Sequence, residues 1–157
     1  MLLEIGSKAP EFNLVSDELK EVKLSDYKGK NVVLLFFPLA FTGVCTTELC
    51  TMRDDMKKFN DLNTDIIAVS IDSPFTLKKF KEEEKFNFSL LSDFNRHASR
   101  AYNSLYEEFP AFGLKGVSKR SAFVIDKEGV VRYQEICGSP GDLPNFDAIK
   151  ETISALN

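Results

Sequence analysis

The chain of 157 residues has the length of a single domain, 1–157, with room for a sizeable hydrophobic core. Hydrophobic residues make up 43% and charged residues 28%, and the net charge of -4 indicates no basic face for nucleic acid or anionic lipid. No apolar run is long enough to span a membrane, and three cysteines are too few for a disulfide framework. We therefore expect no nucleic-acid partner and no membrane association. The first residues contain no long apolar run of the kind a secretory signal has, and the three cysteines lead us to expect a reducing, cytoplasmic location.

The first half of the chain predicts two short strands, a buried strand and a helix. Short strands are expected at Phe12–Leu14 and Val22–Leu24, on either side of a polar turn. The run Asn31–Phe37 is almost entirely apolar and rich in β-branched or aromatic residues, which indicates a strand covered on both faces. Val44–Phe59 is predicted to be a helix, because apolar side chains recur every three or four residues along it. These side chains are Cys45, Leu49, Met52, Met56 and Phe59.

The second half continues the alternation and ends in a hairpin and a helix. Ser73 and Pro74 supply an N-cap and a first-turn proline for a helix that should run to about Phe86. The other expected elements are strands at Ile66–Ile71 and Ser89–Ser92, a helix from a cap at Asp93 or Asn95 to about Leu105, a loop over Tyr106–Gly116, a strand pair at Ser121–Asp126 and Val130–Ile136, and a helix over Pro144–Leu156. Strand–helix alternation favours parallel central strands, and the hairpin adds antiparallel ones. The expected fold is therefore α/β, a thioredoxin-like fold with a mixed central β-sheet flanked by α-helices and short N-terminal strands.

A cysteine stands where the first long helix should begin. The buried strand ends at Pro38, a short turn with Thr42 and a glycine follows, and Cys45 comes next. Unpaired N–H groups and the positive dipole end of a helix favour a thiolate over a thiol, and a thiolate is a nucleophile. Pro38 cannot donate a hydrogen bond and is expected to help shield the sulfur from water. The chain thus looks built around a reactive sulfur at Cys45.

Other residues are candidates for holding that sulfur as an anion. Arg120 directly precedes an expected strand, and its guanidinium keeps its charge at any working pH. Glu48 lies about one helical turn after Cys45 and is placed to hold Arg120. Thr42 offers a hydroxyl at the same turn. Arg53 is a weaker rival of Arg120, because it lies further along the helix.

The segment Phe36–Cys45 resembles the active-site signature of the peroxiredoxins, which combines Pro38, Thr42 and Cys45. It is most similar to the alkyl hydroperoxide reductase E-like branch of that family. The likeness runs nearly from end to end and includes Gly6–Phe12, Leu24–Lys30, Val69–Ser73, Leu91–Asp93 and Lys119–Asp126. The last of these segments looks like the strand that carries the second catalytic cation of the family, here Arg120.

The resemblance implies an antioxidant thiol peroxidase that reduces hydrogen peroxide and organic hydroperoxides. The Cys45 thiolate would attack the terminal peroxide oxygen and become a sulfenic acid, while Thr42, Arg120 and the Cys45 N–H bind the two oxygens. The sulfur must then lie within reach of an incoming oxidant. Because sulfur carries the electrons, no metal, flavin or haem cofactor is expected. The resemblance also implies thioredoxin or a similar dithiol protein as reductant, and a homodimer.

Recovery of the sulfenic acid needs a second thiol, and three sources compete. Cys50 is five residues after Cys45, so an intact helix separates the two by about 140° of rotation and roughly 7.5 Å of rise, beyond disulfide reach. The spacing resembles that of Q-type peroxiredoxins, in which unwinding of this helix is part of the cycle. Cys50 is therefore the first resolving candidate, although it can also be read as a small buried side chain. Cys137, next to a glycine-rich loop, is less favoured, and an external thiol is the remaining source.

Two other classes of function stay open at this point. A peroxide-sensing thiol protein that relays oxidation to a protein partner would use the same Cys45 chemistry. A thioredoxin-fold binding module with an inert buried cysteine would not consume peroxide. A zinc site from the cysteines and His97 is disfavoured, because the chain has no Cys-x-x-Cys pair.

Overall fold

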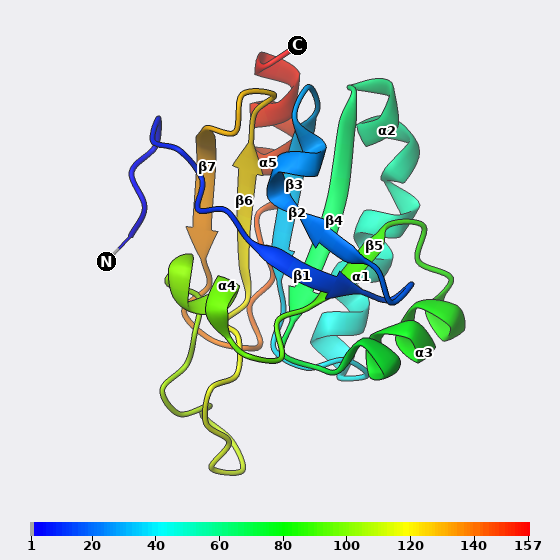
Figure 1. Ribbon diagram of the computed structural model, residues 1–157, viewed down its shortest axis with the longest axis vertical. Helices are drawn as coiled ribbons and strands as arrows, with labels where there is room; N and C mark the ends of the chain where they lie inside the picture. Colours follow the sequence, from blue (N-terminus) through cyan, green and yellow to red (C-terminus); the bar gives the residue numbers. More distant parts are fainter. Residues whose placement is uncertain (1) are drawn as a thin grey trace.

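The computed structural model describes residues 2–157. Their strands form one mixed seven-stranded sheet (Figure 1). In chain order its strands are β1 (Asn13–Ser16), β2 (Glu21–Lys23), β3 (Asn31–Phe36), β4 (Thr64–Ser70), β5 (Ser89–Ser92), β6 (Ser121–Ile125) and β7 (Val131–Ile136). The spatial order is β2-β1-β5-β4-β3-β6-β7. The central strands β5, β4 and β3 run parallel, whereas β1, β2, β6 and β7 pair antiparallel with their neighbours. The expected mixed sheet is confirmed.

Helices cover both faces of this sheet. They are the 3₁₀ helix η1 (Leu24–Tyr27) and the α-helices α1 (Gly43–Asp54), α2 (Met56–Asp61), α3 (Pro74–Glu84), α4 (His97–Ala101) and α5 (Phe146–Ala155). Buried side chains of α1, α2, α3 and α5 form one core layer, and α4 packs on the other face with the N-terminal segment. Figure 1 shows α4 in front of the sheet and α1, α2 and α5 behind it.

The central strand β3 explains why two core layers form. All six of its residues are buried, as expected for a strand covered on both faces. Val33 and Leu35 join the layer under α1, α3 and α5, whereas Val32 and Leu34 join the layer on the other face. Successive side chains of a strand point to opposite faces, so a continuous apolar run serves both layers. The end of β3 is thereby fixed inside the molecule, where α1 begins.

The prediction of one helix over Val44–Phe59 is wrong in one respect, because the chain forms two helices there. α1 ends at Asp54, and α2 begins at Met56. Asp55, between them, has φ -91° and ψ 0°, outside helical geometry. Its carboxylate forms an ion pair of 2.7 Å with Lys150 of α5, which fixes the break against the last helix.

The helix expected to reach Leu105 is also shorter than predicted. α4 ends at Ala101, because Asn103 takes a left-handed conformation with φ 55°. The N-cap of α4 is Arg96 and not Asp93 or Asn95, although the Asp93 carboxylate accepts hydrogen bonds from the N–H groups of Ala98 and Ser99 at 3.0 and 2.6 Å. The N-cap of α3 is confirmed as Ser73, whose hydroxyl accepts from the Thr76 N–H at 3.2 Å.

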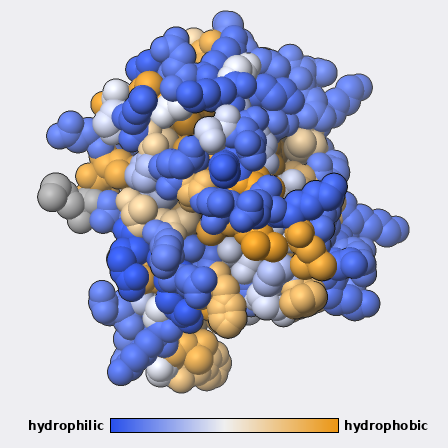
Figure 2. Space-filling model, viewed as in Figure 1, coloured by the Kyte–Doolittle hydropathy of each residue, from blue (hydrophilic) through white to orange (hydrophobic). Residues whose placement is uncertain are grey.

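The carboxyl ends of the parallel strands β3, β4 and β5 meet at one edge of the sheet. α1 begins at this edge, and the loop over residues 106–118 extends below it in Figure 1. Figure 2 shows a mainly polar face with scattered apolar areas, one of them at the lower end of the molecule. Within residues 2–157, no helix combines the length and the apolar character that a membrane crossing requires.

Candidate active site

Cys45 is the third residue of α1, just after the turn that leaves β3. The N-cap of this helix is Thr42, which has an extended conformation with φ -88° and ψ 152°. The first N–H groups of a helix have no acceptor within it and carry a partial positive charge, so an anion is favoured at this place. Cys45 also begins the inward stripe of α1, followed by the fully buried Leu49 and Met52. The helix therefore supports a sulfur anion and turns it toward the core.

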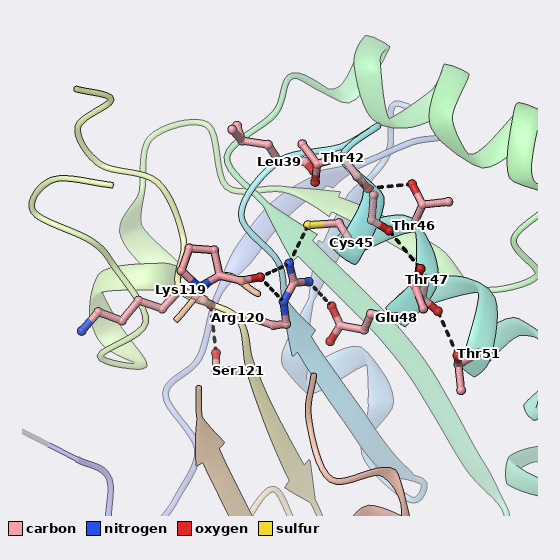
Figure 3. A network of polar contacts seen from close by, with 12 residues as sticks. Leu39, Thr42, Cys45, Thr46, Thr47, Glu48, Thr51, Lys119, Arg120 and Ser121 are labelled. Atoms are coloured by element: carbon pink, nitrogen blue, oxygen red, sulfur yellow. Dashed lines mark hydrogen bonds and ion pairs between the residues drawn. The ribbon is translucent and has the colours of Figure 1, made fainter. Parts of the chain in front are cut away.

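Arg120 bridges Cys45 and Glu48 (Figure 3). Its Nη2 lies 3.1 Å from Cys45 Sγ, and its Nη1 lies 2.7 Å from Glu48 Oε1. Cys45 and Glu48 expose 0% of their surface, and Arg120 exposes 2%. Residues one turn apart on a helix share a face, which explains how a guanidinium from the start of β6 reaches both. The contacts expected of Arg120 and Glu48 are thus present.

The three groups form an ionisable cluster with a single cation. Burial raises the pKa of Glu48 to about 7, although Arg120 acts in the opposite direction. Burial alone would lower the pKa of Arg120, but Glu48 and Cys45 outweigh it and the pKa is raised. Among the described residues, Glu48 Oε2 is buried without a hydrogen-bond partner. Ionisation of both Cys45 and Glu48 next to the single charge of Arg120 is therefore unfavourable in free energy.

The carbonyl of Pro140 accepts from two further N–H groups of Arg120. It accepts from Nε at 3.3 Å and from Nη2 at 3.0 Å. Pro140 lies in the loop after β7, and the backbone at Cys137 ties that loop to β6, because its N–H donates to the Arg120 carbonyl at 2.9 Å. The guanidinium is thereby held in one orientation by α1 on one side and by this loop on the other.

The structure places Thr42 and Pro38 near the sulfur-bearing turn without a bond to the sulfur. The Thr42 hydroxyl donates to the Leu39 carbonyl at 2.8 Å, which leaves its oxygen lone pairs to accept. Pro38 is buried directly after β3. In Figure 3 Thr42 and Leu39 lie on the side of Cys45 opposite Glu48.

The sulfur is closed off in this conformation, contrary to the expectation of open access. Cys45 exposes 0% of its surface, because its helix face packs into the core. The nearest donor, Arg120 Nη2, is shared between the sulfur and the Pro140 carbonyl. An oxidant can reach the sulfur only if neighbouring groups move.

The other two cysteines are free thiols in different surroundings. Cys50 is half-buried, and its Sγ donates to Glu84 Oε2 of α3 at 3.5 Å. Burial raises the pKa of Cys50, and Glu84 adds to this effect while Arg53 opposes it. Burial, with Glu135 and Glu48, raises the pKa of Cys137 to about 11. Cys137 is therefore a poor nucleophile in this conformation.

The remaining candidates are separated from the site. Arg53 bonds Asp54 at 3.0 Å and the Glu84 carbonyl, so it takes no part in holding Cys45. His97 is exposed at the start of α4. The part of the chain that the structure describes contains no group of three or more His, Cys, Asp or Glu side chains able to hold a metal ion.

Pro140 is the site residue that the sequence did not reveal. It acts through its backbone carbonyl, which every residue carries, so its side-chain type gives no signal. The flanking glycines and proline mark a loop there, but only the fold brings this loop against Arg120. Tyr106 is likewise expected only as part of a loop, yet its hydroxyl is buried. Burial raises the pKa of Tyr106, and Arg120 acts in the opposite direction.

Known proteins resemble this chain in sequence and in architecture. The model of the AhpC/TSA family matches residues 5–134. Alkyl hydroperoxide reductase E of Mycobacterium tuberculosis is 36% identical over 158 residues, which cover 99% of each chain. Thioredoxin-dependent peroxide reductase, mitochondrial, of Mus musculus is 37% identical over 95% of this chain and 58% of that relative. A crystal structure of a peroxiredoxin-like protein from Aquifex aeolicus superimposes with a TM-score of 0.90 at 31% identity, over 100% of this chain and 90% of that chain.

Proposed function

Because the chain belongs to the AhpC/TSA family of peroxiredoxins, with their thioredoxin-like fold, we propose that Cys45 is the sulfur that carries its peroxidase activity. The protein is a thiol peroxidase, an oxidoreductase that acts on peroxides. The observation that supports Cys45 is its direct contact with the Arg120 guanidinium at 3.1 Å in the first turn of α1. Neither Cys50 nor Cys137 has both a helix N-terminus and such a donor beside it.

The proposed reaction uses hydrogen peroxide or an organic hydroperoxide. The Cys45 thiolate attacks the terminal oxygen, a sulfur–oxygen bond forms and the oxygen–oxygen bond breaks. Sulfur is oxidised by two electrons to the sulfenic acid, and water or an alcohol leaves after taking up a proton. Arg120 and the first-turn N–H of Cys45 stabilise the charge that moves onto the leaving oxygen. The lone pairs of the Thr42 hydroxyl accept the hydrogen of the peroxide.

Substrate entry requires the Pro140 carbonyl to give up at least one bond to Arg120. The carbonyl oxygen accepts hydrogen bonds from Nε and Nη2, the same donors that a peroxide oxygen would have to bind. Exchange of one acceptor for another keeps the buried guanidinium paired. The loop that carries Pro140 lies outside the strands and helices, so its movement leaves the sheet intact.

Recovery of the sulfenic acid is assigned to Cys50, with Cys137 and an external thiol as the other sources. Both Cys45 and Cys50 lie on the intact α1, so a disulfide between them requires the first turns to unwind. Thr46, Thr47 and Thr51 each donate their hydroxyl to the carbonyl four residues earlier, at 2.9, 3.0 and 2.9 Å (Figure 3). Such bonds weaken a helix and favour its bending. The threonine-rich sequence of α1 thus supports a helix that can open.

We propose a physiological reductant and an oligomeric state on the basis of the family resemblance. The relative from Mus musculus is named as thioredoxin-dependent, and a thioredoxin-like dithiol protein is therefore proposed to reduce the disulfide. A homodimer is proposed from the family resemblance, and large exposed apolar side chains are available for contact with a second copy. Phe41 exposes 48%, Phe75 69% and Phe112 90% of its surface. Sedimentation measurements of the reduced protein test the dimer.

A Cys45→Ser variant tests the proposed site. It should consume no peroxide with dithiothreitol or thioredoxin as reductant, while its circular dichroism stays unchanged. Cys137→Ser, which removes the other buried thiol, is the matched control and should keep the activity. Peroxide consumption by the Cys45→Ser protein would refute the assignment. Slow turnover of the wild type with every dithiol protein would favour a peroxide-sensing role.

A further inference from the structure

The buried cluster around Arg120 contains two acids and one base. Cys45 and Glu48 lie one helical turn apart on α1, and each contacts a different nitrogen of the same guanidinium, at 3.1 and 2.7 Å. Both acids are fully buried. If both were ionised, the cluster would carry a net negative charge away from water, which is strongly unfavourable. The buried cluster therefore favours keeping one proton on one of its two acids.

The surroundings of Glu48 strengthen this argument. Its Oε1 accepts from Arg120, but within residues 2–157 its buried Oε2 has no partner. The other ionisable groups that face it are Glu135 of β7 and Cys137 after that strand, and neither brings a positive charge. An unpartnered buried carboxylate oxygen is much less costly when it carries a proton.

We infer that Glu48 holds the proton of the cluster while Cys45 is a thiolate, and releases it when Cys45 is oxidised. This inference rests on the proposed function of Cys45. In the reduced state, the thiolate and Arg120 balance each other and Glu48 is neutral. In the sulfenic acid state the sulfur is neutral, and the Glu48 carboxylate takes its place beside Arg120. The cluster is electrically neutral before and after the reaction.

The step balances in atoms and charge. The Cys45 thiolate, the hydroperoxide and protonated Glu48 give the Cys45 sulfenic acid, the alcohol and the Glu48 carboxylate. The sulfur–oxygen bond forms, the peroxide bond breaks, and the leaving oxygen receives the equivalent of the proton that Glu48 loses. Glu48 acts on the sulfur through Arg120, and it is a positioning residue that also stores a proton. Its raised pKa, about 7, agrees with this role.

Proton counting during a single turnover tests the inference. Reduced protein in weakly buffered solution is mixed with one equivalent of an alkyl hydroperoxide, and a pH indicator reports proton uptake per sulfenic acid formed. Below about pH 7, the wild type should take up almost no proton, because Glu48 supplies it. Above that pH Glu48 starts ionised, and uptake should rise to one proton per sulfur.

Two variants distinguish proton storage by Glu48 from its structural support of Arg120. Glu48→Gln keeps an oxygen acceptor for Arg120 but has no proton to release, so it should take up one proton at every pH at which Cys45 is a thiolate. Asp54→Asn removes an exposed carboxylate at the end of the same helix and should behave like the wild type. The ultraviolet absorbance of the thiolate establishes the starting state of each protein.

The outcomes distinguish this inference from the proposed function. Trapping the sulfenic acid on Cys45 with dimedone measures the proposed function itself. Sulfenic acid formation with one proton taken up by the wild type below about pH 7 would overturn the inference and leave the peroxidase assignment intact. Equal, pH-independent uptake in the wild type and in Glu48→Gln would overturn it as well. If Glu48→Gln does not fold, the pH dependence of the wild type alone decides.

Discussion

Arg120 Nη2 lies 3.1 Å from Cys45 Sγ, although 75 residues separate the two in the chain. β3 and β6 are paired antiparallel neighbours in the sheet, and this pairing brings the end of β3 and the start of β6 to the same edge. The residue just before β6 therefore faces the helix that follows β3. The register between β3 and β6, more than any local motif, brings the Arg120 guanidinium into contact with Cys45 Sγ.

The first prediction concerns the geometry of that cation. Arg120→Lys keeps a positive charge but loses the fork that serves Cys45, Glu48 and the Pro140 carbonyl together. The second-order rate constant for oxidation of Cys45 by peroxide should fall by about 100-fold or more, the usual effect of losing a donor to a developing anion. Stopped-flow fluorescence or competition kinetics measures it. Arg132→Lys, at an exposed ion pair of β7, is the matched control and should react as the wild type does. An unchanged rate in Arg120→Lys would remove the guanidinium from the mechanism.

The second prediction concerns the resolving thiol. After one equivalent of peroxide, mass spectrometry of the wild type should show a Cys45–Cys50 disulfide, because Cys50 is the thiol that unwinding of α1 can bring to Cys45. Cys50→Ser should stop at the sulfenic acid and lose turnover with thioredoxin. Cys137→Ser should form the disulfide normally, since the raised pKa of Cys137, about 11, makes it a poor nucleophile. A Cys45–Cys137 bond in the wild type would reverse this order.

The third prediction concerns stability and pH. The pKa of Glu48 is raised in the folded protein from an ordinary 4.5 to about 7, so the folded state binds a proton more tightly than the unfolded chain does. The resulting stabilisation is fully present below about pH 4.5 and is lost as the pH rises through about 7. Relative to Glu48→Gln, the wild type should lose about 3 kcal/mol of unfolding free energy over that window. Urea denaturation at several pH values measures the difference, and parallel curves for the two proteins would contradict it.

The fourth prediction concerns access to the sulfur. Pro140→Gly keeps the carbonyl but frees the backbone of the loop, which lowers the population in which this carbonyl covers Arg120. Oxidation of Cys45 by a bulky organic hydroperoxide should become a few-fold faster. Pro110→Gly, at an exposed position of the loop over residues 106–118, is the control and should leave the rate unchanged. A slower reaction in Pro140→Gly would mean that the carbonyl positions Arg120 for catalysis instead of closing the site.

The strand pattern and the meeting of Cys45, Glu48 and Arg120 could be predicted from the sequence, whereas helix ends could not. Alternating or continuous apolar runs locate strands such as Asn31–Phe36, because burial decides them. The break at Asp55 escaped prediction, because it depends on an ion pair with Lys150 from the far end of the chain. The early end of α4 depends on the left-handed conformation of Asn103, which a short polar residue permits without requiring it.

The sequence alone determined the parts of the proposed chemistry: a thiol in the first turn of a helix, a threonine in the turn before it and an arginine just before a distant strand. These are properties of residue type and short spacing. Only the tertiary structure decided that Arg120 also holds Glu48 and the Pro140 carbonyl, and that the sulfur is closed off. Burial and backbone contacts arise from the packing of segments far apart in the chain, and no local pattern encodes them.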